Sequence, residues 1–95
     1  MDLLIWLQDW YKSMCDGDWE HVFGVKIDTL DNPGWTVSVN IADTSLENKP
    51  FNDIHNYVSD DDWMHCTVKD GKFCGDGDSG KLIHMLEIFR KLANS

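Results

Sequence analysis

Apolar residues change their spacing twice along this chain. Over residues 2–14 they recur every three or four positions, which is typical of one face of an amphipathic helix. From Trp19 to Ile41 they mostly alternate with polar residues, which indicates half-buried strands. Over residues 79–93 the helical spacing returns. This order predicts an α+β fold, an antiparallel sheet of four or five strands with an N-terminal and a C-terminal helix packed on it.

The first expected turn separates two alternating runs, residues 19–28 and residues 35–41. Between them stands Asp-Asn-Pro-Gly at positions 31–34. Proline fixes φ for the second position of a type II turn, and glycine readily supplies the positive φ that the third position needs. We therefore expect an antiparallel hairpin with a positive φ at Gly34.

The second expected turn is the Asp-Gly pair at positions 70 and 71, which follows an apolar run at residues 63–68. Asp-Gly is a strong signal for a two-residue hairpin turn. Such a turn would place Val68 opposite Phe73 on the same face of the sheet. The hairpin would supply the third and fourth strands.

The remaining segments are a long connection and a second helix. Residues 43–62 have few large apolar groups, and we expect a short strand or helical turn near residues 53–58. Asp78 or Ser79 is the expected cap of the last helix. The apolar stripe of that helix is predicted to consist of Leu82, Ile83, Leu86, Phe89 and Leu92.

Charge limits the partners that this chain can bind. Its 95 residues are predicted to form a single domain, residues 1–95. Eight Lys and Arg stand against 17 Asp and Glu, which gives a formal net charge of −9. That charge would repel nucleic acid and an anionic membrane surface, so neither is an expected partner. A basic protein is the natural complement, and the sequence leaves the oligomeric state open.

The compartment follows from the start of the chain and from its cysteines. The first residues have no cationic segment, and Asp2 and Asp9 interrupt the apolar stretch, so we expect no signal peptide. No run of about 18 apolar residues is present, so no membrane-spanning helix is predicted. Cys15, Cys66 and Cys74 are an odd number of thiols. We expect a cytoplasmic protein with free cysteines.

Several motifs resemble ligand sites without meeting their requirements. Residues 75–81 fit the glycine and lysine spacing of a phosphate-binding loop, but Leu82 stands where a hydroxyl should bind Mg²⁺. Asp16, Asp18 and Glu20 begin like a calcium loop, but His21 replaces its required glycine. His and Cys residues lack the spacing of a zinc site, and no nucleophile, base and oxyanion donor can be assembled. We therefore expect no enzymatic activity, no cofactor and no metal. A small metal- or ligand-binding protein that uses the Asp-rich loops is the alternative.

Two sequence blocks point to a family. CDGDWEH at residues 15–21 and TLDNPGW at residues 29–35 resemble the immunity protein 53 family, and the resemblance extends over nearly the whole chain. It implies a small bacterial immunity protein of a polymorphic toxin system, which binds a secreted toxin domain stoichiometrically and blocks it. The resemblance does not designate the residues that touch the toxin.

The toxin-binding residues are predicted from the sequence itself. Three consecutive carboxylates, Asp60, Asp61 and Asp62, precede Trp63, which is the tryptophan least explained by core periodicity. Exposed tryptophan beside charge is common at binding interfaces. A second acidic patch consists of Asp16, Asp18 and Glu20. A nuclease toxin would fit such a surface because its nucleic-acid groove must be cationic, and other toxin classes stay open.

Overall fold

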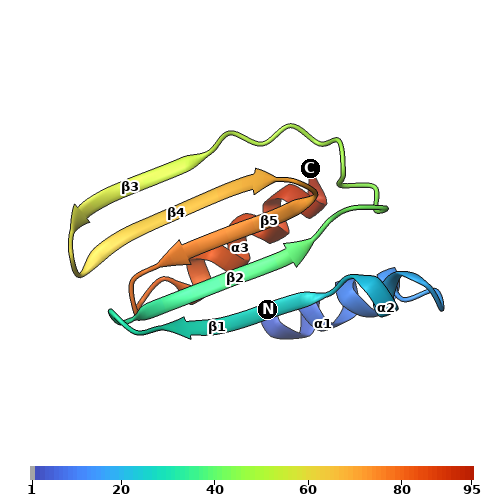
Figure 1. Ribbon diagram of the computed structural model, residues 1–95, viewed down its shortest axis with the longest axis horizontal. Coiled ribbons are helices and arrows are strands. Elements are labelled where there is room, and N and C mark those ends of the chain that lie inside the picture. The colour runs from blue at the N-terminus through green and yellow to red at the C-terminus, as the bar shows by residue number, and fades with distance from the viewer. Residues whose placement is uncertain (1) are drawn as a thin grey trace.

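The computed structural model describes residues 2–95 and forms one five-stranded antiparallel sheet with helices packed against it (Figure 1). The sheet order is β1-β2-β5-β4-β3, so β1 and β3 are its edges. The predicted α+β fold is confirmed. The elements in chain order are α1 (Leu3–Met14), α2 (Trp19–Val22), β1 (Val25–Leu30), β2 (Gly34–Asn40), β3 (Ile54–Ser59), β4 (Asp62–Lys69), β5 (Lys72–Gly77) and α3 (Leu82–Asn94).

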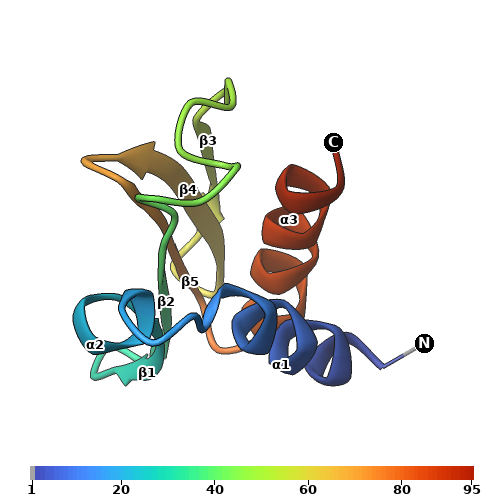
Figure 2. The ribbon, with the colours of Figure 1, turned by 90° about the vertical axis from the view of Figure 1, so that its right-hand side faces the viewer.

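The core lies between the sheet and two helices, α1 and α3, which Figure 2 shows on the same side of the sheet. Phe89 of α3 is fully buried at its centre. Its ring lies 4.9 Å from that of Trp10, 5.4 Å from that of Phe73 and 5.8 Å from that of Trp6. One aromatic cluster therefore joins α1, α3 and the sheet. Within residues 2–95, no helix has the length and apolar content that a membrane span needs.

The N-terminal helix follows its sequence pattern. The Asp2 carboxylate accepts hydrogen bonds from the backbone N–H groups of Leu4 at 2.9 Å and Ile5 at 3.3 Å. Asp2 is therefore the N-cap of α1, and it satisfies N–H groups that have no partner inside the helix. The helix buries Leu3 and Leu7 against the core.

The prediction that residues 19–24 belong to a strand is wrong, because Trp19–Val22 forms the short helix α2. The Asp16 carboxylate accepts from the N–H groups of Asp18 at 3.0 Å and Trp19 at 2.9 Å. The Glu20 carboxylate accepts in return from the N–H groups of Asp16 and Gly17, both at 2.9 Å. This reciprocal capping favours a helical turn, and it overrides the alternating pattern.

The first hairpin is confirmed, but its turn is not type II. Leu30 pairs directly with Gly34, which is the first residue of β2 and does not have a positive φ. Glycine is needed there for a different reason, which is the close approach of β5. A Cβ atom on Gly34 would lie 2.4 Å from the carbonyl oxygen of Gly77.

The second hairpin is confirmed in detail. Asp70 and Gly71 both have positive φ, 54° and 76°, as a type I′ turn requires. Val68 pairs with Phe73 in the resulting register. The short element expected near residues 53–58 is the strand β3.

The last helix begins later than predicted. Its first residue is Leu82, and Lys81 occupies the cap position without a side-chain hydrogen bond. Asp78 and Ser79 therefore do not cap it. Ile83 was expected in the apolar stripe, but it is 52% exposed, and Met85 is fully buried in its place.

Candidate partner-binding surface

The predicted acidic patch lies at the turn between β3 and β4, at one end of the longest axis of the molecule (Figure 1). Asp60, Asp61 and Asp62 are all exposed there. Between Lys49 and Lys69 the chain has four aspartates and neither lysine nor arginine. The acidic charge of this hairpin is therefore concentrated at its turn, with Asp53 just before β3.

A lysine from the start of α3 reaches this patch. The Lys81 ammonium lies 2.8 Å from a carboxylate oxygen of Asp62 and 2.7 Å from one of Asp78. These two contacts raise the pKa of Lys81, with that to Asp62 as the larger cause. A lysine held by two carboxylates is poorly placed to bind a phosphate. The lysine of the phosphate-loop spacing at residues 75–81 therefore has a structural role, which is to pair with Asp62 and Asp78.

Asp78 ties the start of β4 to the segment before α3. Its side chain is only 8% exposed. Besides Lys81, it accepts hydrogen bonds from the N–H groups of Trp63 and Gly80, both at 2.8 Å. The Lys81 hydrogen bond, followed by these two backbone donors, lowers the pKa of Asp78 to about 2. Asp78 is therefore an ionised structural anchor beneath the exposed aspartates.

Trp63 is half-buried and lies on the face of the sheet opposite to the buried Met64. Its ring lies 5.5 Å from that of His65, and its register partner across the strands is Tyr57. His65 pairs with His55, and their Nδ1 atoms are 3.2 Å apart. Because cross-strand partners share a face, these four residues form an aromatic row on the face opposite to the buried Met64. Figure 2 shows that α1 and α3 lie on the same side of the sheet.

Sequence reasoning missed two exposed side chains beside the acidic turn. Tyr57 is 64% exposed and Val58 is 76% exposed. The Tyr57 hydroxyl donates a hydrogen bond to the Asp60 carboxylate, which raises the pKa of the tyrosine. The signal that could have found them is composition, because the sequence of β3, IHNYVS, contains no charged residue in a chain that is 26% charged.

The second predicted patch lies elsewhere. Asp16, Asp18 and Glu20 surround α2, at the other end of an axis that is 42 Å long (Figure 1). The carboxylates of Asp16 and Glu20 already accept backbone N–H groups. Hydrogen bonds from backbone N–H groups lower both pKa values, with that of Trp19 as the largest cause for Asp16 and that of Glu20 itself as the largest cause for Glu20. The structure thus brings residues 60–63 together but keeps them apart from residues 16–20.

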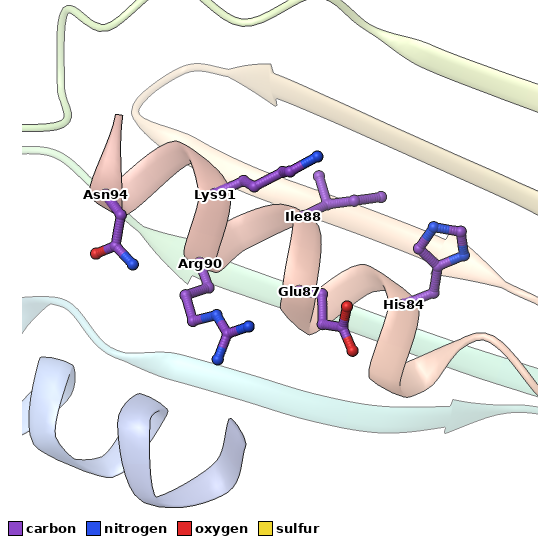
Figure 3. Close-up of a pocket in the computed structure, with 6 residues that line it drawn as sticks. All are labelled: His84, Glu87, Ile88, Arg90, Lys91 and Asn94. Atoms are coloured by element: carbon purple, nitrogen blue, oxygen red, sulfur yellow. The ribbon is translucent and has the colours of Figure 1, made fainter. Parts of the chain in front are cut away.

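Two hollows lie beside these elements. A groove of about 450 Å³ is bounded by residues 55–58 of β3, residues 62–64 of β4, Lys81 and His84. A hollow of about 330 Å³ follows α3, and its lining side chains project from successive turns of that helix (Figure 3). The second hollow combines one carboxylate, that of Glu87, with two cations, so it does not extend the acidic surface. Its lining residues are His84, Glu87, Ile88, Arg90, Lys91 and Asn94.

The thiols and candidate metal ligands lie at separate places in the part of the chain that the structure describes. Among residues 2–95, no group of three or more His, Cys, Asp or Glu side chains is arranged to hold a metal ion. Cys15, Cys66 and Cys74 are free thiols. Burial, followed by the nearby charge of Asp76, raises the pKa of Cys66 to about 11. A thiol with that pKa stays protonated near neutral pH and is a poor nucleophile.

Comparison with known families settles the membership of the chain. The model of the family described as Immunity protein 53 matches residues 4–94, nearly the whole chain. The chain belongs to the immunity protein 53 family. No match was found among curated proteins or among solved structures.

The two blocks that resemble the immunity protein 53 family can now be placed in the fold. Residues 15–21 form the capped turn of α2, and residues 29–35 form the first hairpin with its close approach to β5. Both blocks therefore have structural roles. The acidic turn and the exposed side chains of β3 lie outside them.

Proposed function

We propose that this immunity protein neutralises a cognate toxin domain by stoichiometric binding, without catalysing a reaction, in the bacterial cytoplasm. Membership of the immunity protein 53 family supports the immunity role. The observation that carries the choice of surface is the position of exposed Tyr57 and Val58 beside Asp60 and Asp61. Aromatic and apolar anchors surrounded by charged residues are typical of protein interfaces.

Charge supports a basic partner. The net charge of −9 and the segment between Lys49 and Lys69, which has four aspartates and no lysine or arginine, favour association with a positively charged domain. A nuclease toxin fits this requirement because its nucleic-acid groove is cationic. A toxin of another class with a basic face would fit as well.

The rival hypothesis is a metal- or ligand-binding protein that uses the Asp-rich loops. Asp16 and Glu20 accept backbone hydrogen bonds, and Asp78 is paired with Lys81. These carboxylates are thus already used by the fold, which favours partner binding over the rival. Metal analysis of the purified protein tests the metal-binding form of this rival, which requires bound metal.

Binding kinetics test the proposed surface. The gene immediately upstream is expected to encode a long chain that ends in a toxin domain, and that C-terminal domain is the probe. The first variant combines Asp60→Asn with Asp61→Asn. The matched control combines Asp9→Asn with Asp43→Asn, because it changes the net charge by the same amount at exposed residues outside both predicted acidic patches.

We expect the Asp60/Asp61 variant to associate more slowly than the control at low salt. The difference should shrink as salt is raised, because the screening length falls from about 10 Å at 0.1 M to about 3 Å at 1 M. Trp63→Ala should instead speed dissociation by about 30-fold if Trp63 is an anchor worth about 2 kcal/mol. Rates that match those of the control in both folded variants would show that the interface lies elsewhere.

A further inference from the structure

The two edges of the sheet differ in how they are protected. An edge strand presents unpaired backbone groups, and natural proteins often discourage unwanted pairing with charged side chains. The edge strand β1 has Lys26 and Asp28 near its middle. The other edge strand, β3, has no charged residue, and five of its six residues are exposed. Within the strand itself, β3 therefore lacks the charged side chains that protect β1.

The length of the open edge is limited by an irregularity. The pairing of β3 with β4 is regular from Ile54 to Tyr57, and the register then shifts between Tyr57 and Ser59. Four regular residues span about 13 Å at the rise of an antiparallel strand. An added strand would have His55 and Tyr57 as neighbours on one face, and Ile54 and Asn56 on the other. The groove of about 450 Å³ borders the same strand.

From this edge we infer that β3 binds a β-strand of a basic partner domain, which extends the sheet by one strand. The inference rests on the proposed function and specifies how the toxin domain docks. Backbone hydrogen bonds would supply affinity, and the side chains on the two faces would supply specificity.

Charge decides against a second copy of this chain as the occupant. Asp53 directly precedes β3, and Asp60 and Asp61 directly follow it. Antiparallel pairing of two copies would bring Asp53 of one copy toward the acidic turn of the other, and each copy has a net charge of −9. A partner strand flanked by lysine or arginine would instead be attracted by the aspartates at both ends of β3.

Proline substitution tests the edge without changing the net charge. Successive residues of a strand direct their N–H groups to opposite sides, so one of His55 and Asn56 directs its N–H toward solvent. Proline is tolerated at such an outward position but prevents pairing there. We therefore compare His55→Pro and Asn56→Pro, and we use whichever variant keeps the wild-type circular dichroism spectrum and a cooperative melt. The matched control is a proline on the other edge strand, β1. We use Thr29→Pro or Leu30→Pro, whichever folds.

The expected result is that the folded β3 variant binds the upstream toxin domain about tenfold or more weakly, while the β1 control binds as wild type does. Equal binding by the folded β3 variant, together with slower association of the Asp60/Asp61 variant, would overturn strand pairing and leave the proposed function standing. A wild-type chain that does not bind the domain would overturn both. Sedimentation of the wild-type chain alone should show a monomer. A wild-type dimer that becomes monomeric in the folded β3 variant would overturn the inference, because the occupant of the edge would then be a second copy of the chain.

Discussion

Replacing Phe89 by alanine should remove the centre of the core. The side chain is fully buried, and truncation of a buried phenylalanine costs about 3–5 kcal/mol. Phe89 also contacts Trp6, Trp10 and Phe73, with ring centroids 4.9–5.8 Å apart. Because aromatic pairs contribute about 0.5–1.5 kcal/mol beyond their buried area, we expect a loss in the upper part of that range, about 4–5 kcal/mol.

Urea unfolding followed by tryptophan fluorescence measures this loss, since two of the contacting rings are tryptophans. Ile83→Ala is the control, because Ile83 lies on the same helix and is 52% exposed. The control should cost less than about 1 kcal/mol. If Phe89→Ala does not fold, Phe89→Leu should show a smaller loss with the same sign. A loss below about 1 kcal/mol for Phe89→Ala would refute the packing of α3 described above.

Three further predictions concern single residues. Gly34→Ala should destabilise the fold, because an added Cβ would lie 2.4 Å from the Gly77 carbonyl oxygen. Gly24→Ala is the control, because an added Cβ there meets nothing within 4 Å. Equal unfolding midpoints of the two variants in urea would contradict this prediction. The stabilisation from ionised Asp78 should be present above about pH 4 and be lost as the pH falls toward 2, because its pKa is lowered from 3.8 to about 2. In Asp78→Asn the unfolding free energy should therefore vary less over that interval, and an unchanged acid profile would argue against the anchor. A thiol reagent at neutral pH should modify exposed Cys15 rapidly and buried Cys66 only on unfolding, and equal rates would contradict the burial of Cys66.

Elements that depend on local pattern could be predicted from the sequence. The first helix has a cap and a regular stripe, and the Asp-Gly turn at positions 70 and 71 adopts the positive φ values that its residues favour. The short helix α2 could not be predicted from alternation, because backbone N–H groups that donate to the Asp16 and Glu20 carboxylates favour a helical turn there. Gly34 was correctly singled out but for the wrong reason, because the constraint is the distant Gly77.

The candidate surface likewise has features that could be predicted from the sequence and features that could not. The three aspartates of the β3–β4 turn are a local feature and could be identified directly. The status of β3 as an edge could not, because it follows from the strand order β1-β2-β5-β4-β3. The exposure of Tyr57 and Val58 depends on that order, since a central strand with the same sequence would have a second neighbour. The link between Lys81 at the start of α3 and Asp62 at the start of β4 is likewise a product of tertiary structure.

Hydrogen–deuterium exchange of the chain, alone and in an equimolar complex with the upstream toxin domain, tests the proposed surface most directly. We predict that amides in residues 54–63 become protected in the complex, while those in residues 16–20 exchange as they do in the free chain. Protection confined to residues 16–20, or a complex in which residues 54–63 exchange as before, would contradict the assignment of the β3–β4 end as the toxin-binding surface.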